Sequence, residues 1–243
     1  EVTIGPRHTI GASSSIKNPI ELACRPWPSI GSIVFSSIEV GLPVAAAAPS
    51  IASVYNKSLQ LQDALVLVIS QSGRSPDILA QVEMAKKTGA MVVALVNDIS
   101  SPLADLAHFT LPLHVGAEKA VAATKSYLAT LSAILHLVSV WSGKADLQQA
   151  VAALPASLEA AIALPQQLSA SALDKVAHLV VLGRGLGYAI SREIALKLKE
   201  VCGIHAEAFS SAEFLHGPVT LVKNQFAIVD VTVEDESLQA HRQ

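Results

Sequence analysis

From residue 60 onward, the chain alternates between short runs of Val, Leu and Ile and longer segments with helical spacing. The apolar runs have the length of strands and are bounded by turn residues. They predict strands over residues 64–69, 91–97 and 109–114, and helices over residues 76–87, 102–107 and 117–141. Continuous apolar strands that alternate with helices are typical of a parallel sheet buried on both faces. The pattern therefore predicts an α/β protein.

The second half of the chain repeats this scheme after a break at residues 142–144. It predicts a helix over 146–164, strands over 178–182, 205–209 and 226–231, and a helix over 188–201 that follows a glycine turn. We expect a weak internal duplication, with a first domain over residues 1–145 and a second over 146–243. The second sheet is expected to be incomplete, because the chain stops soon after a strand. Residues 1–45 are left unassigned, because Pro26 and Pro28 stand where a strand and a helix start would be needed.

Composition narrows the class of protein. The 243 residues are 51% hydrophobic and 15% charged, and the net charge of −3 does not favour binding to nucleic acid. Mean hydropathy is +0.46, but the longest apolar stretch, residues 127–141, is too short and too often interrupted to span a membrane. No basic segment followed by an apolar segment opens the sequence, so no secretory signal is expected. The two cysteines cannot form a disulfide framework. These features predict a cytoplasmic protein that binds no nucleic acid and no membrane.

A hydroxyl-rich turn follows the first strongly predicted strand. It reads Ser70-Gln71-Ser72-Gly73-Arg74-Ser75, and Ser75 and Pro76 are typical of an N-cap and a first helical residue. A turn that opens a helix directs free backbone N–H groups and a positive dipole end at one point, which suits a phosphate. An ordinary capped turn needs only one hydroxyl, and this turn has three. The sequence therefore predicts a phosphate-binding loop.

The helix expected after the glycine turn has a charged face. Glu193, Lys197 and Glu200 have the spacing i, i+4 and i+7, which places them on one side. The simplest interpretation is a solvated stripe of charge. The alternative is catalytic, because ligand sites in α/β proteins gather where strands end in such turns, and a carboxylate beside a lysine can move protons at carbon.

Two further features have structural and functional interpretations. His216, within Glu213-Phe214-Leu215-His216-Gly217-Pro218, is either a structural or a catalytic histidine. His205 and His216 are too far apart, without cysteine partners, to predict a metal site. The turn at residues 183–187 approximates a dinucleotide-binding motif, but its third glycine comes one residue early. No cofactor is therefore expected.

Four motifs occur in an order that resembles the SIS (sugar isomerase) family. They are residues 70–75, Ala122-Ala123-Thr124-Lys125, residues 195–200, and residues 205–208 with 213–218. The similarity runs from about Gly41 to Val222. It is strongest to the isomerase half of glucosamine-6-phosphate synthase and to stand-alone amino-sugar-phosphate deaminases.

The resemblance implies two flavodoxin-like SIS domains, each a parallel sheet flanked by helices, and a homodimer with a hexose-phosphate site between domains. It implies a phosphate loop made of Ser70, Gln71, Ser72 and Ser75. It also implies a contact between the backbone of Val121 and the sugar. Glu200 matches the family's base for C1–C2 proton transfer, and Lys197 the lysine beside it. His216 matches a ring-opening histidine donated across the dimer.

The chain differs from the family pattern in three respects. Residues 25–31 stand where the family has a sugar-binding turn, and Ala123 stands where it has a serine. From the resemblance we also expect the family's C-terminal tail, with its substrate-facing lysine, to be lacking. The expected function is isomerisation and deamination of an amino-hexose 6-phosphate without a metal or organic cofactor. Two alternatives remain: a non-catalytic sugar-phosphate-binding regulatory module, and the isomerase part of a glucosamine-6-phosphate synthase.

Overall fold

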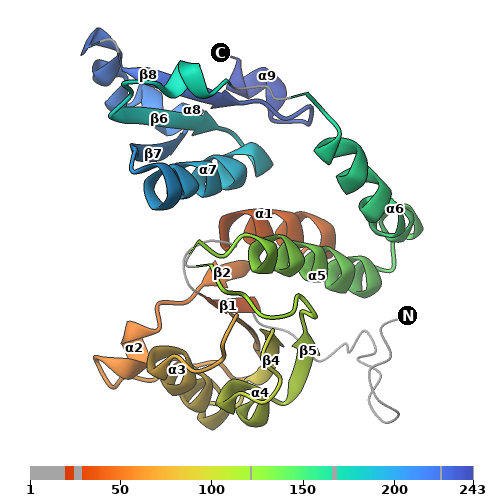
Figure 1. Cartoon of the computed structure of the whole chain (residues 1–243). Coiled ribbons are helices and arrows are strands. Elements are labelled where there is room, and N and C mark those ends of the chain that lie inside the picture. The colour runs from red at the N-terminus through yellow and green to blue at the C-terminus, as the bar shows by residue number, and fades with distance from the viewer. Residues whose placement is uncertain (1–19, 25–28, 121, 166–168, 225, 243) are drawn as a thin grey trace.

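The computed structural model describes residues 20–24, 29–120, 122–165, 169–224 and 226–242 (Figure 1). This part of the chain forms two parallel sheets, one of five strands and one of three. We call the five-stranded sheet with its helices the first unit, and the three-stranded sheet with its helices the second unit. The prediction of an α/β fold with parallel sheets flanked by helices is confirmed.

The first sheet has the strand order β2-β1-β3-β4-β5, and all four pairings are parallel. Its strands are β1 (Ile20–Cys24), β2 (Val44–Ala46), β3 (Leu65–Ser70), β4 (Met91–Val96) and β5 (Phe109–Pro112). In β3 the side chains of Val66 and Val68 join one buried cluster, and those of Leu65 and Leu67 join another on the opposite face. Because side chains alternate along a strand, an unbroken apolar run buries both faces, as the sequence predicted.

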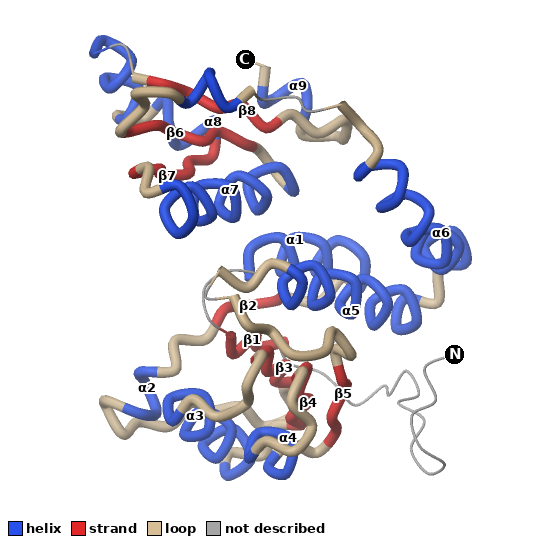
Figure 2. Tube along the Cα trace, in the orientation of Figure 1, coloured by secondary structure: helices blue, strands red, loops and turns tan. Residues whose placement is uncertain are grey.

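Helices cover both faces of this sheet (Figures 1 and 2). They are α1 (Ser29–Val40), α2 (Ser50–Ser53), α3 (Pro76–Lys87), α4 (Pro102–Leu106) and α5 (Lys125–Ser142). Val82 of α3 and Leu103 of α4 are fully buried in the cluster around Val66 and Val68. Ile134 of α5 is buried in the cluster on the other face. The sheet is therefore the middle layer of a three-layer unit.

The second sheet repeats the beginning of the first. Its order is β7-β6-β8, so the first strand lies in the middle with the second and third on either side, as in β2-β1-β3. The strands are β6 (His178–Gly183), β7 (His205–Ser210) and β8 (Ala227–Val231). The shared order agrees with the internal duplication expected from the sequence.

The second unit is joined to the first by α6 (Ala145–Ile162). Its other elements are α7 (Leu186–Cys202), α8 (Ser211–Leu215), α9 (Leu238–His241) and two 3-10 helices, Ala170–Leu173 and Pro218–Asn224. Ala195 of α7 packs in a buried cluster with Leu179 and Val181 of β6. On its other side α7 contacts α1 of the first unit. The helix therefore lies between the two units.

The structure assigns part of the region that the sequence left open and corrects one expected boundary. Residues 20–24, 29–40 and 44–46 form β1, α1 and β2, and Pro26 and Pro28 lie outside the described residues. The helix predicted over 117–141 begins only at Lys125. Lys125 Nζ donates to the carbonyl of Ala117, and Ser126 Oγ donates to Glu118, so the preceding segment folds back instead of extending the helix.

Among the described helices, none is both long enough and apolar enough to cross a membrane.

Candidate functional site

The predicted phosphate loop lies between β3 and α3. Ser70 is the last residue of β3, and its Oγ accepts a hydrogen bond from Gly73 N at 3.0 Å. Gly73 has φ +63, and a Cβ at this position would collide with the side chain of Ser101. A tight turn with positive φ beside packed atoms requires glycine. Ser70 is half-buried, whereas Gln71 and Ser72 are exposed at the surface of the loop.

Ser75 differs from its expected role in one respect. It occupies the N-cap position of α3 with extended backbone angles, and Pro76 follows as predicted, but its side chain makes no capping hydrogen bond. The hydroxyl is therefore not committed to closing the helix end. The turn leaves the first N–H groups of α3 without a side-chain cap from Ser75, which is the arrangement that an anion at a helix N-terminus can use.

Contacts from the end of β4 hold this loop in place. Asp98 N donates to the carbonyl of Gln71 at 3.3 Å, and Leu103 N donates to the carbonyl of Gly73 at 3.2 Å. Arg74 forms an ion pair of 2.9 Å with Asp98. Hydrogen bonds from the Ser100 hydroxyl and then from Arg74 lower the pKa of Asp98 below its ordinary value. The loop's own arginine thus faces Asp98, and the remaining donors of the loop are neutral.

The charged face predicted on α7 is present. Lys197 Nζ lies 2.8 Å from Glu200 Oε2 and 3.5 Å from Glu193 Oε1. The side chains of Glu193, Lys197 and Glu200 are only 13%, 21% and 23% exposed, so this is not a fully solvated stripe. One ammonium is placed between two carboxylates on the side of a helix that lies between the units.

Tyr127 adds a residue that the sequence reasoning missed. It lies on α5 of the first unit, and burial together with the negative charge of Glu193 raises its pKa to about 12. Burial also raises the pKa of Glu193, and the nearby Glu200 acts in the same direction against the attraction of Lys197. Glu193, on the charged face of α7, therefore lies close enough to Tyr127 at the start of α5 for its charge to act on that hydroxyl. The only hint in the sequence was that Tyr127 follows Lys125 of the second motif by two residues.

The other predicted site residues are not joined to this group. His216 is the exposed C-cap of α8, where its backbone N–H donates to the carbonyl of Glu213. Within the described part of the chain, no hydrogen bond or ion pair connects His216 with Lys197 or Glu200. Val121 lies outside the described residues. Ala123 is half-buried in the non-helical segment before α5. The structure thus brings Glu200 and Lys197 together and places the Ser70–Ser75 residues on one loop.

The glycines of the second turn have a packing role. A Cβ on Gly183 would collide with Ser191 and with the backbone of Gly187, and one on Gly187 would lie 3.1 Å from the carbonyl oxygen of Val231. Ser191 Oγ lies within hydrogen-bonding distance of the carbonyls of Leu182 and Gly187. These glycines let α7 approach β6 and β8 closely. In the described residues there is no group of three metal-ligating side chains.

Comparison with known proteins identifies the family. The SIS domain model matches residues 23–140 and 172–242, more than half of the chain. The chain belongs to the SIS domain family. It is 34% identical over 199 residues to a glutamine–fructose-6-phosphate aminotransferase (isomerizing) from Sulfurisphaera tokodaii, which covers 81% of this chain and 33% of that protein. The enzyme of the same name from Vibrio parahaemolyticus is 33% identical over 197 residues, covering 76% of this chain and 32% of that protein. The SIS chain thus spans about a third of the length of these curated relatives.

Solved structures agree with this assignment. A candidate phosphosugar isomerase from Silicibacter pomeroyi is 39% identical, with a TM-score of 0.86 over 91% of this chain and 69% of that one. The C-terminal domain of a glucosamine–fructose-6-phosphate aminotransferase from Francisella tularensis is 28% identical, with a TM-score of 0.76 over 92% and 67%. A glucosamine-6-phosphate deaminase from Thermotoga maritima shares the fold at 22% identity, with a TM-score of 0.75 over 94% and 72%.

Proposed function

We propose that this SIS protein isomerises and deaminates an amino-hexose 6-phosphate. The observation that carries the proposal is the 2.8 Å pair between Lys197 and Glu200 on the half-buried face of α7. A carboxylate held there is suited to take a proton from one sugar carbon and return it to the next. Negative charge would develop on the oxygen of the enediol or enolamine intermediate, or on its nitrogen. Lys197 supplies a positive charge beside it.

The phosphate would be held by the loop between β3 and α3. Ser70, Gln71, Ser72 and Ser75 offer neutral donors beside the N-terminal N–H groups of α3. Gln71 and Ser72 are exposed, and Arg74 is paired with Asp98, so the loop would recognise phosphate through hydrogen bonds. Val121 is proposed to contribute a backbone contact to the sugar, and the division at residues 145 and 146 would separate two domains that share the substrate.

The reaction can be written with its atoms balanced. His216 would open the ring by moving a proton between the ring oxygen and O1. Glu200 would remove the proton from C2 of the open-chain aldose and deliver it to C1, which converts the C2 amine to an imine. Water then adds to the imine carbon, and ammonia leaves with the formation of a ketose 6-phosphate. No redox step is involved.

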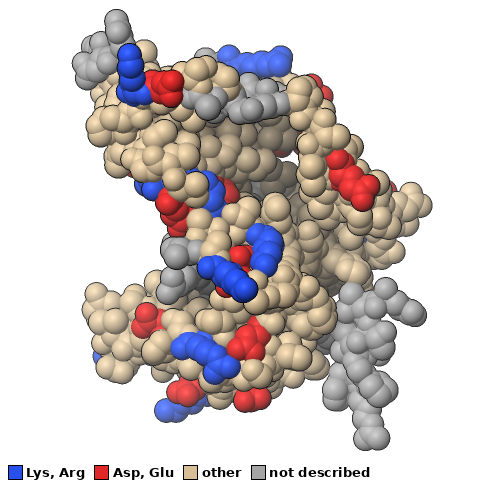
Figure 3. All heavy atoms as spheres, in the orientation of Figure 1, with Lys and Arg blue, Asp and Glu red and all other residues tan. Residues whose placement is uncertain are grey.

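The relatives support a second candidate, because the curated proteins above are aminotransferases that use fructose 6-phosphate by name. In that case the chain would be the isomerase part of a longer synthase and would work in the opposite direction. The third candidate is a sensor that binds sugar phosphate and does not turn it over. For all three we propose a homodimer in the cytoplasm. On the face shown in Figure 3, basic and acidic side chains are interspersed, in agreement with a small-molecule ligand.

One set of assays separates these functions. The protein would be incubated with glucosamine 6-phosphate in D₂O, with ammonia release and loss of the C2 proton followed by enzymatic assay and NMR. Ammonia release with C2 exchange supports the deaminase. Proton exchange at C1 of fructose 6-phosphate, with no ammonia released from glucosamine 6-phosphate, supports the isomerase part of a synthase. Tight binding without exchange would overturn the catalytic proposal in favour of a sensor.

A further inference from the structure

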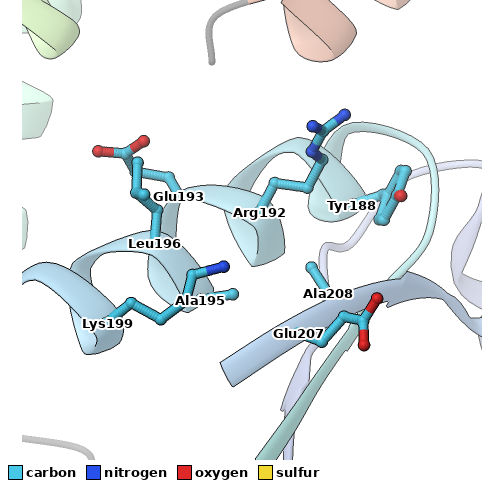
Figure 4. A pocket seen from close by; sticks show the side chains of 8 residues that line it. All are labelled: Tyr188, Arg192, Glu193, Ala195, Leu196, Lys199, Glu207 and Ala208. Carbon is cyan, nitrogen blue, oxygen red and sulfur yellow. The ribbon is translucent and has the colours of Figure 1, made fainter. Parts of the chain in front are cut away.

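A cavity of about 370 Å³ lies on the flank of α7, beside the edge strand β7 (Figure 4). This volume is at the lower end of the range of about 300–1,000 Å³ found for small-molecule sites. The polar groups that line it are Tyr188, Arg192, Glu193 and Lys199 from α7 and Glu207 from β7. Lys197 and Glu200 do not line it, and the Glu193 carboxylate points away from Lys199 and Glu207 in Figure 4. The cavity therefore adjoins the charged face of α7 at Glu193, but the proposed catalytic pair, Lys197 and Glu200, lies outside it.

The charges of this cavity are not paired with one another. Arg192, Lys199 and Glu207 form no ion pair or side-chain hydrogen bond with any residue in the part of the chain that the structure describes. Two ion pairs elsewhere in the described chain join such groups, Arg74 with Asp98 and Lys144 with Glu39. Two cations from one helix and a carboxylate from the adjoining strand thus face a shared hollow with their hydrogen-bonding capacity unused.

The two cations lie on one side of α7. They are seven residues apart, which is about 10.5 Å along a helix axis, and their long side chains can converge on a single group. Arginine and lysine together are typical ligands of a phosphate. Glu207 accepts hydrogen bonds and, as an anion, attracts an ammonium. Tyr188, which lies beside Arg192 in Figure 4, adds a ring and a hydroxyl to the lining.

We infer that this cavity is a second ligand site, which binds a small phosphate monoester that also carries an ammonium group. The phosphate would lie between Arg192 and Lys199, and the ammonium would lie at Glu207. The charge of Glu193 is matched by its ion pair with Lys197. The other three charged side chains, Arg192, Lys199 and Glu207, sum to +1, and a doubly ionised phosphate with one ammonium sums to −1, so the charges match. The inference is independent of the proposed catalysis, since it concerns binding at residues outside the proposed active site.

The test is an NMR titration of the full chain in a Ser70→Ala, Ser72→Ala background, which weakens the proposed phosphate loop. Glucosamine 6-phosphate is the main probe, with glucose 6-phosphate, glucosamine and inorganic phosphate for comparison. The amide signals of Ala195 and Ala208, which line the cavity, report on it directly. We expect the amide signals of both alanines to shift saturably with glucosamine 6-phosphate. Glucose 6-phosphate and inorganic phosphate should bind more weakly, and glucosamine should bind most weakly of the four probes.

Substitutions assign the binding groups. Arg192→Gln with Lys199→Gln should weaken glucosamine 6-phosphate at this cavity by about 10-fold or more, because charge-assisted hydrogen bonds to phosphate are lost. Glu207→Gln should remove the preference for the amino sugar phosphate over glucose 6-phosphate. The matched control is Lys57→Gln with Lys87→Gln, which removes two exposed positive charges from the first unit. At about 0.15 M salt it should change the affinity by less than about twofold, because distant surface charges are screened.

Three results would overturn the inference. The first is that glucosamine 6-phosphate causes no shift of the Ala195 and Ala208 signals. The second is that these shifts persist unchanged in the variant with Arg192→Gln and Lys199→Gln. The third is that the lysine control loses as much affinity for glucosamine 6-phosphate as that variant does. Circular dichroism of each variant confirms that it is folded. Because the readout is binding at these two alanines, a failure here would leave the ammonia-release assay unaffected, and the reverse also holds.

Discussion

Glu200 and Lys197 form one ion pair of 2.8 Å, so replacing either residue removes the charged partner of the other. We expect Glu200→Gln to lower kcat by at least about 10²-fold while affinity for the sugar phosphate is largely kept, because the base is lost and the shape remains. The measurement is C2 proton exchange with solvent, together with the dissociation constant. Glu159→Gln, an exposed carboxylate on α6, is the control and should leave both unchanged. An unaltered exchange rate in Glu200→Gln would remove this residue from the mechanism.

Glu193 gives a prediction about pH and stability. Burial raises its pKa in the folded protein above the ordinary value of 4.5, so the folded state favours the neutral acid. Stability from this group is then fully present below pH 4.5 and is lost as the pH rises through the folded pKa. The charged groups that face it are Lys197 and Glu200 on α7, with Tyr127 from α5. Relative to Glu193→Gln, the unchanged protein should therefore be more stable at low pH than at neutral pH.

Urea unfolding of both proteins between pH 4 and pH 7 measures this difference. Glu83→Gln, an exposed carboxylate on α3, is the matched control for a general effect of removing one negative charge. If the difference in unfolding free energy between the unchanged protein and Glu193→Gln were independent of pH, or grew in the opposite direction, Glu193 would not be the buried acid described above.

At the scale of elements, the conformation of the β3–α3 loop depends on a glycine at position 73. Gly73→Ala forces a side chain into a backbone with φ +63 and against Ser101 and Leu103. Gly143→Ala, at the C-cap of α5, has nearly the same φ of +68 but meets no atom within 4 Å. Both variants should lose roughly 1–2 kcal/mol from the left-handed backbone, and Gly73→Ala should lose more because of the collision. Denaturant unfolding measures this, and equal losses would contradict the packing argument.

The same loop should determine phosphate affinity. Ser70→Ala with Ser72→Ala removes two donors, and we expect binding at the proposed active site to weaken by roughly 1–3 kcal/mol if these donors are lost from a sheltered site. Titration of the catalytic rate against substrate concentration follows this site. Ser157→Ala, an exposed hydroxyl on α6, is the control. An unchanged KM in the double variant would mean that the phosphate is held elsewhere.

At the scale of the whole molecule, His216 and Glu200 belong to the same unit, but no hydrogen bond or ion pair joins them in the described part of the chain. If His216 serves the site of a neighbouring subunit, a mixture of inactive His216→Ala and inactive Glu200→Gln should regain activity through hybrid dimers with one intact site. Subunit exchange would be verified with two differently sized tags. No recovery after complete exchange would place His216 in the site of its own subunit or outside any site.

Much of this protein could be predicted from local sequence. The bounds of α3 are those predicted, because a turn with Pro76 after Ser75 and a glycine at residue 89 define where that helix starts and stops. The buried strands β3 and β4 followed from unbroken apolar runs. The charged face of α7 followed from helical spacing alone. In each case the information lies within a few residues of the feature that it determines.

The tertiary structure decided the features that depend on distant residues. Residues 117–124 look helical by composition, but Glu118 and Ala117 bond back to Ser126 and Lys125, so α5 starts later. The role of Arg74 depended on Asp98 in the next βα turn. The raised pKa of Tyr127 depended in part on Glu193 from the other unit. Spacing along one helix shows which charges share a face. Only the packing of the second unit against the first determines which of those charges lose water and have their pKa values shifted.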